Sequence, residues 1–182
     1  MVTETFDLVV IGGGTGGLRL ALRAANAGLK TAIVDSNNKL GGTCLNTGCI
    51  PTKALLHAAE LYRDFSEAGK FGIEVSGVRA NFKKIMGRMR AIVLEGQVHI
   101  NKSIKTRGLT LVHERAAFVN AKTLQAGKRL LRAKKFVIAT GAHPVVPNIT
   151  GLNSLSAGQA MVSDDILTLN SLPSSLAIIG GG

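Results

Sequence analysis

Residues 8–17 read Leu-Val-Val-Ile-Gly-Gly-Gly-Thr-Gly-Gly, an apolar run that ends in a cluster of glycines. The run predicts a buried strand over residues 6–11. Helix-forming residues follow from 15 to 26, and Gly28 predicts the end of that helix. A short strand expected over 31–35 completes a parallel strand–helix–strand unit with a right-handed crossover.

The glycines at 12, 14 and 17 fit the spacing G-x-G-x-x-G. Gly12 allows a tight turn, Gly14 lets a pyrophosphate approach the backbone, and Gly17 lets the helix pack closely on the strand. Asp35 ends the next predicted strand, where a carboxylate can accept a hydrogen bond from a ribose hydroxyl. This context predicts dinucleotide binding over an ordinary glycine-rich turn, and it does not distinguish FAD from NAD.

Composition excludes several classes of protein. The chain has 182 residues, of which 46% are hydrophobic and 18% charged, so we expect a folded interior and not a disordered or fibrous chain. Its apolar runs are too short for a membrane helix, and Glu4 and Asp7 lie where a secretory signal is basic. We therefore expect a cytoplasmic protein with no membrane partner. Two cysteines and isolated histidines predict no metal site.

The net charge of +11 is unevenly distributed. Residues 79–135 contain 15 basic and 2 acidic residues, which gives +13 for this segment. Such a segment could bind nucleic acid, contact an acidic partner, or form a solvated surface. We expect the solvated surface and no nucleic-acid partner, because the chain has one tyrosine, no tryptophan and no aromatic residues interleaved with the charges.

Cys44 and Cys49 are five positions apart. On an ideal helix their Cα atoms would be about 8 to 9 Å apart, beyond the roughly 7 Å that a disulfide spans. A bond between them needs broken helical geometry, which Gly48 and Pro51 can provide. Lys53 lies one helical turn after Cys49, and its ammonium and a helix N-terminus would each favour a thiolate. The alternative is two small buried hydrophobic residues.

The rest of the chain is predicted to alternate between helical and extended segments. We expect a loop over 36–51 and helices over 52–68 and 81–105. Short strands are predicted at 109–113, 116–119, 130–131 and 136–139, and we expect a small antiparallel sheet from 109 to 131.

The sequence Leu-Val-Val-Ile-Gly-Gly-Gly at 8–14 nearly repeats as Leu-Ala-Ile-Ile-Gly-Gly-Gly at 176–182. We expect a strand over 176–179. Because such a glycine turn serves to aim a helix N-terminus at a phosphate, we expect the chain to be a fragment that continues into a second dinucleotide-binding domain. The predicted domains are 1–150, and 151–182 as a linker and the first strand of the next domain.

The stretch Leu-Gly-Gly-Thr-Cys-Leu-Asn-Thr-Gly-Cys-Ile-Pro-Thr-Lys, residues 40–53, resembles the redox-active signature of the class I pyridine nucleotide-disulfide oxidoreductases. The resemblance extends over the whole chain. It includes the glycine turn at 12–17, the acid at Asp35, the strands at 109–119 and the stretch FVIATGAHPVVP at 136–147.

This resemblance implies an α/β fold: a three-layer Rossmann-like FAD-binding domain with a parallel sheet, a helical pair and a small antiparallel sheet. It implies FAD as cofactor and NAD(P)H as electron donor. By position, Cys49 would form the charge-transfer contact with the flavin, Cys44 would exchange with a disulfide substrate, and Lys53 would lie near the flavin N5 edge. The implied cofactor-binding residues are Gly12, Gly14, Thr15, Gly17, Asp35, Gly42, Thr43, Ala117, Thr140 and Gly141.

The function implied is electron transfer to a small-molecule or protein-bound disulfide, as in the dihydrolipoamide dehydrogenase branch of the family. A mercuric-reductase-like enzyme is the alternative, and Thr52 disfavours the glutathione reductase branch, which usually has lysine there. The contrasting class is a non-catalytic module that binds nucleotide or nucleic acid. We expect a homodimer for the longer protein, and no turnover by these 182 residues alone, because they lack the family's later domains.

Overall fold

The structure, a computed structural model, describes residues 2–156 and 158–181. Gly182, the last glycine of the repeated turn, lies outside the described residues. The strands are β1 (Val2–Ile11), β2 (Thr31–Val34), β3 (Thr110–Val112), β4 (Ala116–Asn120), β5 (Thr123–Ala126) and β6 (Arg129–Ile138). The helices are α1 (Thr15–Asn26), α2 (Gly42–Asn46), α3 (Cys49–Glu67), α4 (Phe82–Thr106) and α5 (Ser163–Ile166).

The strands form one six-stranded sheet in the order β3-β2-β1-β6-β5-β4. The first four strands in this order are parallel, and β5 and β4 continue the sheet in antiparallel pairs. The central strand β1 pairs on both sides, with Val10 opposite Ile33 of β2 and opposite Val137 of β6. The predicted α/β class with a parallel sheet is confirmed.

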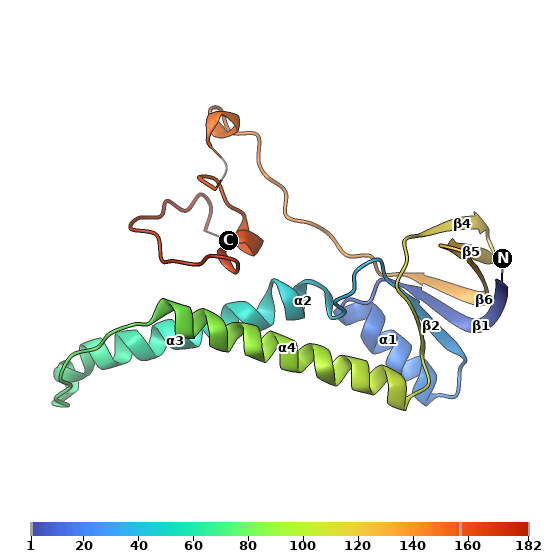
Figure 1. The fold of residues 1–182 in the computed structure, drawn as a ribbon, viewed down its shortest axis with the longest axis horizontal. Helices are drawn as coiled ribbons and strands as arrows, with labels where there is room; N and C mark the ends of the chain where they lie inside the picture. The colour runs from blue at the N-terminus through green and yellow to red at the C-terminus, as the bar shows by residue number, and fades with distance from the viewer. Residues whose placement is uncertain (1, 157, 182) are drawn as a thin grey trace.

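Helices cover one face of the parallel strands (Figure 1). Leu18 and Ala21 of α1 and Ile104 of α4 are buried there against Val10 and Ile33. Full burial of a valine or leucine side chain stabilises a fold by about 1.5–3 kcal/mol. The apolar side of α1 therefore fixes the glycine turn that precedes it against the end of β1.

The opposite face is buried by the antiparallel end of the same sheet. Phe6 and Val9 of β1 pack in one cluster with Leu124 of β5 and Leu131 of β6. The sheet thus folds over itself, and a helical layer, the parallel strands and the antiparallel strands form three layers.

The predicted antiparallel part differs in extent from the observed one. The strand expected at 109–113 is β3, which is parallel to β2 and not antiparallel to its sequence neighbours. The segments expected at 130–131 and 136–139 are one ten-residue strand, β6, that pairs with β1 and β5 on its two edges. The middle of this strand was not predicted, because three of the four residues at 132–135 are charged. Arg132, Lys134 and Lys135 are exposed, and only Ala133 between them is buried.

Two long helices extend away from the sheet side by side (Figure 1). The first of them, α3, begins at Cys49 and not at the predicted Thr52. Proline is tolerated in the first turn of a helix, so Pro51 does not delay the start. The second, α4, begins one residue after the predicted start, because the Asn81 side chain accepts a hydrogen bond from the Lys84 amide at 3.0 Å and caps the helix.

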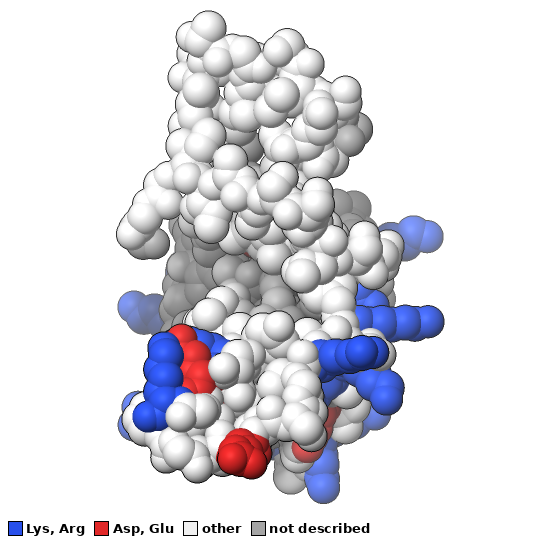
Figure 2. All heavy atoms as spheres, turned by 90° about the vertical axis from the view of Figure 1, so that its left-hand side faces the viewer, with Lys and Arg blue, Asp and Glu red and all other residues white. Residues whose placement is uncertain are grey.

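Basic side chains are dispersed on the hairpin formed by α3 and α4. Figure 2 shows lysine and arginine on both sides of this end of the molecule, with acidic side chains among them. The basic residues near the start of α4 are exposed: Lys83, Lys84, Arg88 and Arg90. These four side chains are solvated, and the absence of a nucleic-acid partner stays a prediction.

Residues 139–156 and 158–181 form mostly irregular structure, with a short 3-10 helix at Leu152–Ser154 and the short helix α5. Residues 176–179, where a strand is predicted, are unpaired in this structure, and Ile178 and Ile179 are 80% and 75% exposed, so their place as the first strand of a further domain stays a prediction. A strand needs a neighbour to accept its backbone hydrogen bonds, and among residues 2–156 and 158–181 none pairs with this segment. In the same part of the chain, no helix has the length and apolar character needed to cross a membrane.

Candidate functional site

The turn between β1 and α1 requires glycine for steric reasons. Gly12 has φ +106°, and a Cβ there would overlap the carbonyl oxygen of Ala139. A Cβ on Gly17 would overlap the carbonyl oxygen of Gly12. Both positions are therefore restricted to glycine by the close approach of α1, β1 and the end of β6.

A second glycine pair packs against this turn. The Gly41 amide donates to the carbonyl of Gly13 at 2.8 Å, and Gly14 and Gly41 form an isolated parallel bridge. Gly42 has φ +57°, and a Cβ on it would lie 2.7 Å from the Cα of Gly14. The start of α2, which carries Thr43 and Cys44, is thereby held against the N-terminus of α1.

Asp35 braces the glycine turn. One of its carboxylate oxygens accepts from the amide of Gly13 at 2.6 Å, and the other accepts from the amide of Asn37 at 2.8 Å. Gly13 is a residue that the motif leaves unspecified, and its role depends on this bond and on the close approach of Leu40. Each carboxylate oxygen can accept a further bond, so the ribose contact expected of Asp35 stays a prediction.

The cysteines lie on either side of a break between two helices. Cys44 is in α2, Cys49 is the first residue of α3, and the two helices are separated at Thr47 and Gly48. The structure has the break in helical geometry that a disulfide between them would need, and it lies at Gly48 and not at Pro51. Both cysteines are free thiols in the structure, with Cys44 half-buried and Cys49 exposed.

The pKa of the Cys44 thiol is raised above its ordinary value. Hydrogen bonding with Cys49 is the largest cause, and burial adds to it. The Thr15 hydroxyl and the charge of Lys53 act in the opposite direction but do not prevail. The charge of Lys53 therefore favours the thiolate of Cys44, as expected of a nearby ammonium, but the neighbouring thiol and burial outweigh it.

Cys44 also lines a small cavity. The cavity has a volume of about 200 Å³ and lies between the start of α1, the α2–α3 break and α4. Its walls are almost entirely apolar and include Leu18, Leu45, Ile50 and Ile100. Thr15 and Arg19 of α1 also border it, but they add almost no polar surface. Cys44 thus borders a small apolar space that also reaches Thr15 at the glycine turn.

Asn46 was not identified from the sequence, although it holds the cysteine segment in place. Its amide nitrogen donates to the carbonyl of Gly42 at 2.9 Å and to that of Leu40 at 3.2 Å. Its oxygen accepts from the Gln97 side chain of α4 at 2.7 Å. The tendency of asparagine to bind nearby backbone was the available signal, but the contact with Gln97 joins residues 51 positions apart.

The remaining expected site residues are divided between two places. Thr140 follows Ala139 directly beside Gly12, and Gly141 has φ +75° in the same exposed segment. Ala117 lies on β4, at the far edge of the sheet, exposed and paired with Gln125. The structure therefore brings Thr140 to the glycine turn, whereas Ala117 belongs to the antiparallel edge.

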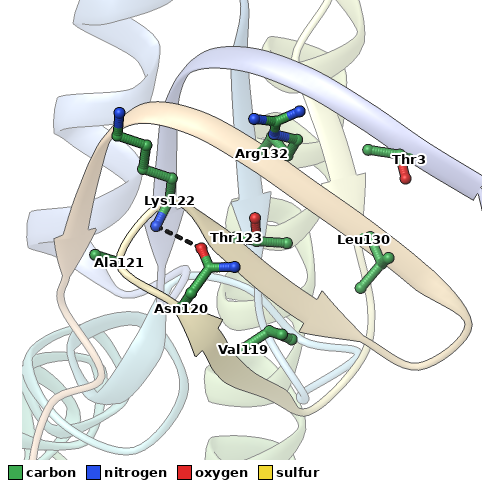
Figure 3. A pocket seen from close by; sticks show the side chains of 8 residues that line it. All are labelled: Thr3, Val119, Asn120, Ala121, Lys122, Thr123, Leu130 and Arg132. Atoms are coloured by element: carbon green, nitrogen blue, oxygen red, sulfur yellow. Dashed lines mark hydrogen bonds between the residues drawn. The ribbon is translucent and has the colours of Figure 1, made fainter.

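A larger hollow of about 600 Å³ lies at the turn between β4 and β5 (Figure 3). Lys122 and Arg132 line it, and the Asn120 side chain accepts from the Lys122 amide at 2.9 Å. It contains none of the expected site residues. Within the described part of the chain, no group of three or more His, Cys, Asp or Glu side chains is arranged to hold a metal ion.

A family model described as "Pyridine nucleotide-disulphide oxidoreductase" matches residues 6–182. The chain belongs to this family. The match includes the glycine turn, the cysteine pair and the segment after β6. Membership implies FAD as cofactor and NAD(P)H as electron donor.

Similar proteins carry names from the same family. The chain is 38% identical to dihydrolipoyl dehydrogenase of Bacillus subtilis, with 100% of this chain and 40% of that protein covered. It is 33% identical to glutathione reductase of a Nostoc species, with 100% and 38% covered. The chain thus spans about two fifths of the length of these relatives.

A solved structure is also similar. The HOCl-induced flavoprotein disulfide reductase RclA from Escherichia coli, in its Cu(II) complex, matches with a TM-score of 0.75 and 28% identity. The match covers 92% of this chain and 34% of that chain.

The residues of the glycine turn fit the implied cofactor. A dinucleotide needs backbone that a phosphate can approach closely and a helix N-terminus directed at it. An added Cβ on Gly16 would meet nothing within 4 Å, and one on Gly14 would meet the Cα of Gly42 at 3.7 Å, an ordinary contact distance. The N-cap of α1 makes no side-chain hydrogen bond, so the first amides of the helix are not capped by a side chain.

Proposed function

We propose that the chain is the FAD-binding part of a flavoprotein disulfide oxidoreductase similar to dihydrolipoyl dehydrogenase. Electrons would pass from NAD(P)H to the cysteine pair and on to a disulfide substrate. The observation that supports this most strongly is the contact of Gly14 with Gly41 and Gly42, since it joins the nucleotide turn to the helix that carries Cys44. When bound, FAD supplies the chemistry that links two-electron donation by a nicotinamide to reduction of a disulfide.

Different residues of the chain would bind the pyrophosphate and the ribose of FAD. Backbone at Gly12, Gly14 and Gly17 and the start of α1 at Thr15 suit the pyrophosphate. Asp35 would accept from a ribose hydroxyl. The further residues proposed to bind FAD are Gly42, Thr43, Ala117, Thr140 and Gly141.

The cysteines would carry out thiol–disulfide exchange. The Cys44 thiolate attacks one sulfur of the substrate, a mixed disulfide forms, and one substrate thiolate leaves and takes a proton from water. The Cys49 thiolate then attacks the Cys44 sulfur, which releases the second substrate thiol and leaves a Cys44–Cys49 disulfide. Two electrons have passed to the substrate. The cavity beside Cys44 supports the assignment of Cys44 as the cysteine that meets substrate. Cys49 would then be the cysteine on the flavin side.

The wider organisation is part of the proposal. Residues 1–150 would be the FAD-binding domain, and 151–182 the linker and first strand of an NAD(P)-binding domain. The exposed apolar residues of the α3–α4 hairpin, such as Leu56 and Phe65 at 54% each, favour a homodimer of the longer protein. A cytoplasmic location suits a protein reduced by NAD(P)H.

A titration of the chain with FAD, followed by flavin fluorescence, tests the cofactor site. We expect saturation at one equivalent and loss of binding in Gly12→Val, whose side chain would overlap Ala139. The control is Gly69→Ala, where an added Cβ meets nothing within 4 Å. Absence of FAD binding together with strongly salt-dependent DNA binding would support the nucleic-acid module instead.

A further inference from the structure

Helix α4 closely approaches the two residues that follow Cys44. A Cβ added to Gly96 of α4 would lie 2.5 Å from the side chain of Leu45. One residue further along the helix, the half-buried side chain of Gln97 donates to the side-chain oxygen of Asn46 at 2.7 Å. Leu45 and Asn46 lie between the two cysteines in sequence, so α4 contacts the chain that separates the sulfurs.

Asn46 also fixes the backbone that precedes Cys44. Its amide nitrogen donates to the carbonyl oxygens of Gly42 at 2.9 Å and Leu40 at 3.2 Å. Among the residues that the structure describes, Gln97 is the one that donates to the side-chain oxygen of Asn46. Removal of the Gln97 donor would therefore loosen the end of α2 from α4 and leave the bonds from Asn46 to the backbone in place.

The reduced cysteine pair depends on such contacts more than an oxidised pair would. Both cysteines are free thiols in the structure, so the contacts of the intervening chain restrict how far the two sulfurs can separate. A disulfide would impose that restriction by itself. A contact that already restricts the dithiol form therefore reduces the conformational entropy that is lost when the disulfide forms.

We propose that Gln97 is a positioning residue for the Cys44–Cys49 pair, and that its hydrogen bond to Asn46 favours the disulfide over the dithiol. The inference rests on the proposed function, in which the two cysteines form a disulfide in each cycle. Gln97 acts through Asn46, and loss of its donor should shift the pair toward the dithiol.

The test equilibrates the chain with reduced and cyclic oxidised dithiothreitol. Formation of the Cys44–Cys49 bond breaks the S–S bond of oxidised dithiothreitol, which takes up two electrons and the two thiol protons. The chain has two cysteines, so its mass after acid quenching, unfolding and alkylation gives the fraction in the disulfide form. A substitution that destabilises both forms equally leaves the equilibrium constant unchanged, so a structural role of Gln97 alone would not alter it.

We expect Gln97→Met, which keeps the length of the side chain and removes the donor, to lower the equilibrium constant for disulfide formation. The decrease should be about two- to tenfold, the range that corresponds to one net hydrogen bond. Gln97→Ala removes the same donor with a smaller side chain and should also lower the constant. Gln125→Met is the matched control and should leave it unchanged, because Gln125 is exposed on β5 and donates to the carbonyl of Gly127 at 3.3 Å.

The inference is overturned if either substitution at Gln97 leaves the equilibrium constant unchanged or raises it, or if Gln125→Met lowers it equally. In these cases the disulfide has still formed, so the proposed function stands. If the wild-type chain forms no Cys44–Cys49 disulfide at any ratio of oxidised to reduced dithiothreitol, the proposed function fails and the inference fails with it.

Discussion

Cys44 holds its proton more tightly than an ordinary cysteine does, and its neighbour is the main reason. We expect Cys49→Ala to lower the pKa of Cys44, because the largest of the causes that raise it is removed. The rate of iodoacetamide labelling at Cys44, measured by peptide mass spectrometry across pH, should then reach its midpoint at lower pH than in the wild-type chain. An unchanged or higher midpoint would contradict the assignment.

Lys53 changes the pKa of Cys44 in the opposite direction from Cys49. Its charge lowers the pKa of Cys44, so Lys53→Gln should move the same midpoint to higher pH and slow labelling at neutral pH. Lys70 is a suitable control, since it pairs with Glu67 near the distal end of the hairpin. Lys70→Gln should leave the midpoint in place.

Asp35 is the residue whose carboxylate holds the buried amide of Gly13. We expect Asp35→Ala to reduce the free energy of unfolding by about 1–3 kcal/mol, the usual cost of leaving a buried donor without its partner. Urea unfolding followed by circular dichroism measures it. If stability is unchanged, the carboxylate does not support the turn.

At the scale of elements, the contact between the first glycine turn and α2 is sensitive to an added methyl group. Gly42→Ala should destabilise the fold by about 1–3 kcal/mol, because it combines positive φ with a Cβ 2.7 Å from Gly14. Gly16→Ala is the matched control: it lies in α1 with open space, and alanine there should stabilise the helix by about 0.5–1 kcal/mol. Equal effects of the two substitutions in urea unfolding would contradict the steric argument.

The elements next to the glycine motif could be predicted from sequence because local chemistry determines them. The bounds of α1 agree with the prediction at both ends, since the glycine turn starts it and Gly28 follows its end. The break between the cysteines was expected only as a requirement for a disulfide between them, and Gly48 lies at it, whereas Pro51 lies inside α3. Asn46, by contrast, depends on a partner in α4, and the course of β6 depends on strands from both ends of the sequence. Long-range pairing of this kind leaves no local pattern.

For the whole molecule, the first and last strands of the parallel sheet are joined by an ion pair. Glu4 of β1 accepts two hydrogen bonds from Arg129 of β6, at 2.7 and 2.9 Å, and this lowers the pKa of Glu4. A lowered carboxyl pKa stabilises the fold at neutral pH, and this contribution is lost as the pH falls through the lowered value. Both side chains are about one third exposed, so we expect Glu4→Gln to cost less than about 1 kcal/mol.

Urea unfolding at neutral pH and at a pH below the lowered pKa of Glu4 tests the contribution of the Glu4–Arg129 pair to stability. The difference between the wild-type chain and Glu4→Gln should be present at neutral pH and disappear in acid. A difference that grows in acid would show that the pair does not act through the ionised carboxylate.

The central claim for the whole molecule is that a flavin cofactor and the cysteine pair occupy one site. The most direct measurement is the rate at which Cys49 is alkylated in the 182-residue chain, with and without saturating FAD, read by peptide mass spectrometry. We predict that FAD slows alkylation of Cys49 severalfold, and that Gly12→Val abolishes this protection. An alkylation rate at Cys49 that FAD leaves unchanged, while FAD is bound, would contradict the claim.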